Sequence, residues 1–108
     1  MTRKPNILIV QADQLTALCL TAYGKPLALT PNIDKIAAQG TVFANTYCNS
    51  PVCGPSRAGM MTGRIPSNVG VFDNAGEFLS SEPTFAHYLR ALGYQTTLCG
   101  KMHFVGPD

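Results

Sequence analysis

One cysteine of this chain stands in a context that could support chemistry. Cys53 is followed by Gly54, Pro55, Ser56 and Arg57, and the run after the proline favours a short helix. The cysteine could be a small buried hydrophobe, half of a disulfide, a metal ligand or a nucleophile. A proline in the first turn would leave Cys53 at the helix N-terminus, where backbone N–H groups and the helix dipole favour an anion. Arg57, one turn further on, can offer a planar pair of donors to oxyanion oxygens.

Two further polar clusters follow apolar runs that favour strands. Asp13-Gln14 comes after one run and the Lys101–His103 loop after another, while Cys53 lies in the loop after a third. Ligands of parallel α/β sheets bind at the carboxyl ends of the strands, so we expect these clusters to converge at one edge. No histidine close in sequence to Cys53 could act as its base, and Asp13 indicates a cation instead.

The elements that must position these residues follow from the hydrophobic pattern. Strands are expected at residues 6–11, 41–47 and 94–98. One helix is expected to be opened by Thr30 and Pro31 and ended by Gly40, a second to span 55–62, and a third to span 83–92. Helices and strands that alternate over short connections predict an α/β fold, with a mostly parallel sheet flanked by helices.

The composition is that of a globular protein with little solvated surface. Of the 108 residues, 45% are apolar and only 13% are charged, so we expect more protein to cover its faces. The net charge of +2 and the scattered basic residues argue against nucleic-acid binding. The apolar run at 7–10 is too short for a signal peptide or a membrane span, which predicts a cytoplasmic protein without a disulfide framework. Three strands are few for such a sheet, so residues 1–108 are expected to be the N-terminal, incomplete part of one catalytic domain.

The motif at residues 53–57, continued by Thr62-Gly63-Arg64, resembles the C-x-P-x-R signature of the type I sulfatases of the alkaline phosphatase superfamily. PNILIVQADQ resembles the first strand of that family with its metal-binding acid, TPNIDKIAAQG its first helix, and GKMHFVG its lysine–histidine loop. The segments ADQ, FDNAGEF and GKMHFVGPD are most similar to the choline sulfatase branch. The resemblance covers nearly the whole chain.

The resemblance implies that Cys53 is oxidised to formylglycine by a formylglycine-generating enzyme. The hydrated aldehyde would attack sulfur, and the sulfated hemiacetal would then expel sulfate, which divides one hard step into two. It also implies a divalent metal held by Asp13, by Gln14 through its neutral carbonyl and by modified Cys53, with Ca²⁺ expected and Mg²⁺ or Mn²⁺ as alternatives. Most sulfatases have two acids where this chain has Asp13-Gln14, and the remaining metal ligands and the leaving-group acid lie outside residues 1–108.

Four further residues receive roles from the resemblance. Arg57 would orient the diol, Lys101 would contact sulfate, and His103 would bind the diol or assist hemiacetal breakdown. Asn74 would contact substrate, although Asp73-Asn74 is also a common turn sequence.

Each candidate also has a structural interpretation. Asp13 could cap a turn, Lys101 could be a solvated lysine and His103 a structural histidine. His87 is expected to pack on a helix rather than to act in catalysis. Cys48 has no second cysteine pair at ligand spacing, which argues against zinc, and the absence of C-x-x-C argues against a redox thiol protein.

The predicted function is the hydrolysis of a sulfate monoester, choline-O-sulfate, to choline and sulfate. The alternatives are a phosphonate monoester or phosphodiester hydrolase of the same superfamily, and a catalytically silent fragment with unmodified Cys53. Besides the small sulfate ester and the modifying enzyme, the expected partner is the rest of the sulfatase chain. A homo-oligomer is left open, and neither nucleic acid nor membrane is expected.

Overall fold

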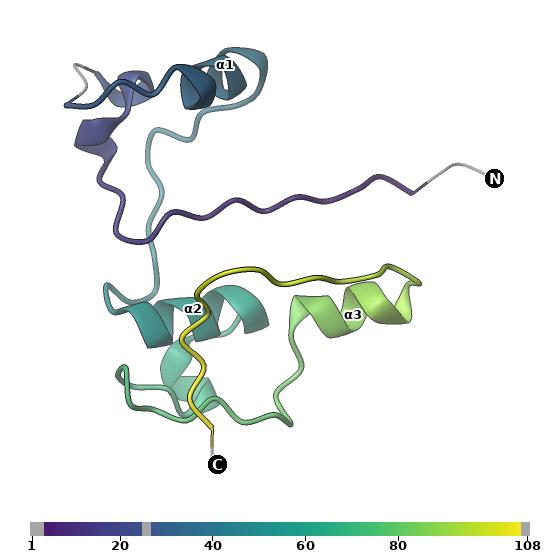
Figure 1. Cartoon of the computed structure of the whole chain (residues 1–108). Helices are drawn as coiled ribbons and strands as arrows, with labels where there is room; N and C mark the ends of the chain where they lie inside the picture. Colours follow the sequence, from purple (N-terminus) through teal and green to yellow (C-terminus); the bar gives the residue numbers. More distant parts are fainter. Residues whose placement is uncertain (1–3, 25–26, 107–108) are drawn as a thin grey trace. The chain divides into compact units, whose positions relative to one another are not determined.

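The computed structural model describes residues 4–24 and 27–106 and divides the chain into two compact units, Met1–Thr46 and Tyr47–Asp108 (Figure 1). The first unit contains two short 3₁₀ helices, η1 (Ala17–Cys19) and η2 (Thr21–Tyr23), and the helix α1 (Pro31–Gln39). The second contains α2 (Cys53–Thr62), η3 (Pro66–Val69) and α3 (Phe85–Ala91). All three α-helices lie where the sequence predicts them, with small differences at their ends.

Helix α1 begins as predicted, with Thr30 before it and Pro31 in its first turn. The Thr30 hydroxyl donates to Asp34 Oδ1 at 3.2 Å instead of accepting a backbone N–H, and the Thr21 hydroxyl donates to Asp34 Oδ2 at 3.2 Å. The acid in the first turn therefore ties η2 to the start of α1. None of the described residues of this unit is buried, so they form no core among themselves.

The predicted parallel sheet is not confirmed. Residues 6–11, 41–47 and 94–98 form no strand, and the described residues contain one isolated parallel bridge, between Glu77 and Val105. Residues 7–10 are extended but carry their apolar side chains in solvent, with exposed fractions of 56% for Ile7 and 86% for Leu8. The apolar pattern of a segment indicates which side chains a strand would bury. The strand itself forms only when a neighbouring segment pairs with its backbone.

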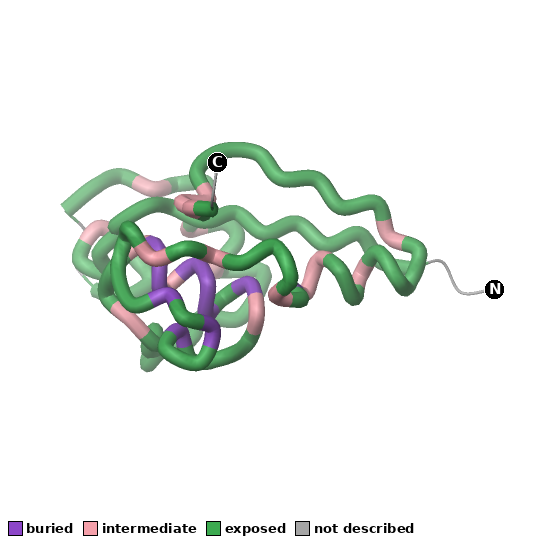
Figure 2. The backbone as a smooth tube through the Cα atoms, turned by 90° about the horizontal axis from the view of Figure 1, so that it is seen from below, coloured by how far each residue is buried: buried purple, intermediate pink, exposed green. Residues whose placement is uncertain are grey.

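A small core lies under α2 in the second unit. Ala58 of α2 packs with Val69 and Val71, and Phe78 covers this cluster from the side. The buried residues, purple in Figure 2, lie mostly in α2 and in residues 66–71 after it, with Thr84 further along the chain. Gly63 ends α2 in the left-handed region, with φ 68°, and its N–H donates to the Gly59 carbonyl at 2.9 Å.

Helix α3 is shorter than the predicted 83–92 and is fixed at its N-terminus by a cap. The Thr84 N–H donates to His87 Nδ1 at 3.0 Å, and the His87 N–H donates to the Thr84 carbonyl at 2.9 Å. His87 is exposed and acts in this reciprocal cap, in line with the structural role expected for it. No described helix has the length and apolar character needed to span a membrane.

Candidate active site

Cys53 is the first residue of α2, two residues earlier than the predicted helix start. Val52 precedes the helix in an extended conformation, and its carbonyl accepts the Ser56 N–H at 2.9 Å. The Cys53 side chain is partly exposed, whereas most of the helix after it is buried. The Cys53 side chain is therefore accessible, while most residues of the helix that carries it are buried.

The expected anion site of open backbone N–H groups is wrong for the residues after Cys53. The Gly54 N–H donates to Asn74 Oδ1 at 2.8 Å, Pro55 has no N–H, and the Ser56 N–H is used by Val52. These donors are satisfied within the chain. The N–H groups of Gly54 and Ser56 are therefore not available to an anion.

The loop at 72–76 supplies the partner of Gly54. Asp73 Oδ1 accepts the Ala75 N–H at 2.9 Å, which is the turn chemistry expected of this sequence. A Cβ on Gly54 would lie 3.1 Å from the Asp73 carbonyl oxygen and 3.3 Å from Asn74 Cα. The loop therefore rests directly on the helix N-terminus at a position that only glycine fits without a shift. Sequence reasoning missed this contact because nothing local connects residues that are 20 positions apart.

Two basic side chains reach the surroundings of Cys53. Arg57 is 6% exposed, and its Nη1 donates to the Lys101 carbonyl at 2.7 Å. The Lys101 ammonium lies 3.9 Å from Cys53 Sγ. The structure thus brings together three of the predicted catalytic residues. In the sequence, Lys101 is 44 positions from Arg57 and 48 positions from Cys53. The Lys101 ammonium gives the surroundings of Cys53 a positive charge, which suits an anionic group.

His103 lies two residues beyond Lys101 in a strained turn. Its φ of 56° is in the left-handed region, which a residue with a Cβ adopts at a cost. Its Nδ1 is buried and has no hydrogen-bond partner among the described residues. The neighbouring Phe104 ring packs against Phe78, with 4.7 Å between ring centroids.

Asp13 and Gln14 belong to the first unit, and their convergence with Cys53 stays a prediction. Both are exposed, and Gln14 has a φ of 51°. A carboxylate and an amide carbonyl are hard oxygen ligands of the kind that Ca²⁺ prefers, but Ca²⁺ takes about six to eight such oxygens. The described residues contain no group of three acidic, histidine or cysteine side chains that could hold a metal. The metal role predicted for Asp13 and Gln14 therefore stays a prediction.

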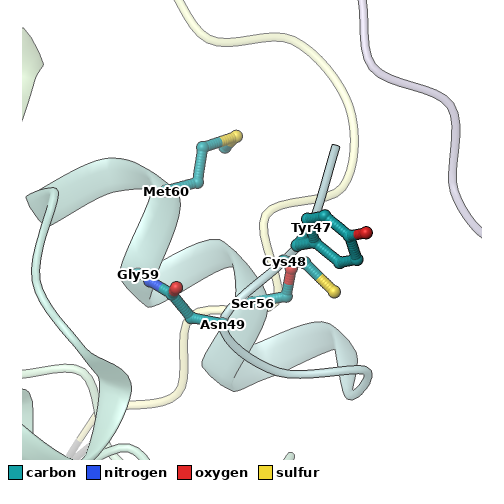
Figure 3. A pocket seen from close by; sticks show the side chains of 6 residues that line it. All are labelled: Tyr47, Cys48, Asn49, Ser56, Gly59 and Met60. Atoms are coloured by element: carbon teal, nitrogen blue, oxygen red, sulfur yellow. The ribbon is translucent and has the colours of Figure 1, made fainter. Parts of the chain in front are cut away.

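The described residues also form an open pocket beside α2 (Figure 3). Its lining comes from α2 and from the segment before it: Tyr47, Cys48, Asn49, Ser56, Gly59 and Met60. None of the predicted site residues lines this pocket.

Comparison with known proteins gives a consistent result. The sequence model of the sulfatase family matches residues 5–106. A choline-sulfatase of Rhizobium meliloti (strain 1021) is 49% identical over 107 residues, which cover 99% of this chain and 21% of that protein. An N-acetylglucosamine-6-O-sulfatase of Bacteroides thetaiotaomicron is 39% identical over 104 residues (96% and 19%), and arylsulfatase A of Homo sapiens is 39% identical over 115 residues (100% and 23%). The chain spans about a fifth of the length of these curated relatives.

Proposed function

The chain belongs to the sulfatase family, and from this premise we propose that it is the N-terminal part of a longer sulfuric ester hydrolase that cleaves a sulfate monoester. The observation that carries the proposal is the grouping of Cys53, Arg57 and Lys101 at the start of α2. The Lys101 ammonium lies 3.9 Å from Cys53 Sγ, and the Arg57 guanidinium holds the Lys101 backbone. This is a nucleophile position with a positive charge beside it.

The proposed chemistry depends on conversion of Cys53 to formylglycine, whose hydrated aldehyde supplies the nucleophilic oxygen when formed. The residues of this chain then have separate tasks. Lys101 binds a sulfate oxygen and offsets the charge that develops on the ester during attack. Arg57 fixes the lysine loop against α2 and so keeps the cation at the nucleophile. His103, with its buried Nδ1, is the group in this segment that can move a proton.

A divalent metal is a further part of the proposal, with Ca²⁺ as the expected ion. Asp13 and Gln14 would supply two of its oxygen ligands, and residues beyond this chain would supply others. When bound, the ion would polarise a sulfate oxygen.

The substrate proposed is choline-O-sulfate. The support is the 49% identity to a protein named choline-sulfatase, against 39% to the other two sulfatases. A formylglycine enzyme of this kind also needs a formylglycine-generating enzyme as a partner, and the predicted location remains the cytoplasm.

The proposed architecture is the α/β sheet of the alkaline phosphatase superfamily. Residues 6–11, 41–47 and 94–98 would become its strands once the rest of the protein supplies neighbours, because their apolar side chains are exposed in the structure. Amide hydrogen exchange of the full-length protein tests this point. Slow exchange across all three ranges is expected, and fast exchange would rule the sheet out.

Steady-state kinetics of the full-length protein tests the activity. We expect hydrolysis of choline-O-sulfate with a higher kcat/KM than that of an aryl sulfate or of a matched phosphonate monoester. A higher value for the phosphonate would assign the protein to the phosphonate hydrolases, and a higher value for the aryl sulfate would remove choline-O-sulfate as the substrate.

Peptide mass spectrometry of residue 53 supplies the second test. An aldehyde in place of the thiol is expected in protein from the native host. An unmodified thiol together with no turnover would favour the catalytically silent alternative.

A further inference from the structure

The turn that carries His103 is anchored on both sides. On one side, the carbonyl of Lys101 accepts the buried Arg57 guanidinium at 2.7 Å. On the other, the carbonyl of Val105 accepts the Phe78 N–H at 2.7 Å, and Glu77 forms a parallel bridge with Val105. His103 lies midway between these two anchors. Arg57 belongs to the cysteine motif, whereas Phe78 belongs to neither the cysteine motif nor the lysine–histidine loop.

Such anchoring is required because the histidine conformation is unfavourable in two ways. Its φ of 56° is left-handed, and its Nδ1 is buried without a hydrogen-bond partner among the described residues. A strained backbone of this kind persists only where the surroundings determine it. A buried polar atom without a partner is unfavourable as well, because it has lost its hydrogen bonds to water. The two anchors must together offset these costs.

Phe78 is the residue that connects the histidine turn to the core under α2. Its side chain packs against the buried cluster of Ala58, Val69 and Val71. Its ring also contacts the ring of Phe104, the residue after His103, with 4.7 Å between centroids and 39° between planes. The backbone and the side chain of one residue thus hold the turn to the helix that begins at Cys53.

From this geometry we propose that Phe78 is a positioning residue that sets His103 relative to residue 53. The proposal rests on the proposed function, because it assumes that His103 acts in turnover. The Phe78 ring restrains Phe104, the Phe78 N–H restrains Val105, and both contacts keep the His103 turn in its left-handed conformation.

Two substitutions in the full-length protein separate positioning from core filling. Phe78→Leu keeps an apolar side chain on the cluster and loses the ring contact, whereas Phe78→Tyr keeps the ring. We expect Phe78→Leu to lower kcat by about 10- to 100-fold, because misplacement of a catalytic group by about 1 Å costs up to about 100-fold. KM should stay unchanged, and Phe78→Tyr should retain the wild-type kcat. Leu79→Ala, next in sequence and half exposed, is the matched control and should retain it too.

Phe104→Leu removes the same ring contact from the other side and should reproduce the loss in kcat. It also serves as the test variant if Phe78→Leu does not fold. A wild-type kcat in both leucine variants would overturn the proposal. An equal loss in Phe78→Tyr or in Leu79→Ala would overturn it as well, because the ring would then not be the cause.

A crystal structure of Phe78→Leu separates this inference from the proposed function. If the wild-type protein hydrolyses no sulfate ester, the proposed function fails, and the backbone of His103 decides the positioning claim alone. Relaxation of φ out of the left-handed region in the variant supports the claim. An unchanged turn overturns it.

Discussion

Replacing Gly54 by alanine has two opposing effects on the stability of the protein. The glycine lies in α2 with an ordinary negative φ, so alanine fits its backbone. A new methyl group would nevertheless lie 3.1 Å from the Asp73 carbonyl oxygen, 3.3 Å from Asn74 Cα and 3.3 Å from Asn74 Oδ1. Two of these three contacts are with backbone, which cannot turn away as the end of a side chain can.

The magnitude follows from three terms. Alanine in place of glycine inside a helix stabilises by about 1 kcal/mol. A methyl group forced into a packed contact destabilises by about 1–3 kcal/mol. If the loop retreats, the crowding is relieved but the bond from Gly54 N–H to Asn74 Oδ1 is lost, which costs about 1 kcal/mol. The second and third terms are alternatives, so after the first term the variant should be less stable by up to about 2 kcal/mol.

Gly59→Ala in the same helix is the matched control. Its new methyl group would lie 3.3 Å from the Arg64 carbonyl oxygen and 3.4 Å from a side-chain atom of Pro66, so the crowding is milder. We expect its stability to lie within about 1 kcal/mol of the wild-type value, because helix propensity offsets the contact.

Urea denaturation of the two full-length variants measures the difference, with kcat and the mass of the residue-53 peptide recorded on the same samples. Modification at residue 53 should be complete in both, so a lower kcat in Gly54→Ala would report the displaced loop. Equal denaturation midpoints for the two variants would refute the claim that loop 72–76 rests on the start of α2.

The remaining predictions concern the nucleophile, the metal, the arginine and the helix cap. Cys53→Ala should abolish turnover with an unchanged far-UV circular dichroism spectrum, since the side chain is small and partly exposed; substantial residual activity would remove it as the nucleophile. Chelation of divalent ions should lower activity and Ca²⁺ should restore it, and indifference to both would argue against Asp13 as a ligand. Arg57→Lys should destabilise by about 1.5–3 kcal/mol and lower kcat, because the buried guanidinium bond to the Lys101 carbonyl is charge-assisted; a wild-type unfolding midpoint would contradict this. His87→Ala should cost about 1 kcal/mol through loss of the cap and leave kcat unchanged, and a fall in kcat would give the histidine a role not assigned to it.

The helices could be predicted because their signals are local. Pro31 and Gly40 bound α1, Gly63 ends α2 in the left-handed conformation, and Gly93 follows α3 with a φ of 83°. Helix ends depend on residues within one turn, so single residues determine them. The start of α2 lies earlier than predicted because a proline in the first turn marks the beginning of a helix only to within a residue or two.

The candidate site could be predicted only where sequence motifs mark it. The motifs predict Cys53, Arg57 and Lys101 as site residues, and the structure brings them together. The contact of Asn74 with Gly54 and the packing of Phe78 on Phe104 have no local signal, because they join loops through tertiary packing. The apolar pattern predicts three strand segments, but the structure does not confirm that they pair into a sheet. The pattern within one segment does not specify which other segment it pairs with.

The extended run at residues 7–10 has a practical consequence for handling this chain by itself. Four consecutive β-forming apolar residues, with their side chains in solvent and no β-ladder along them, form a template on which identical chains can pair. Production of residues 1–108 alone is therefore expected to give insoluble, β-rich aggregates, and a lysine at position 8 or 10 should delay their formation. In residues 1–108 alone, a segment expected to be covered by neighbouring strands is thus open to self-association.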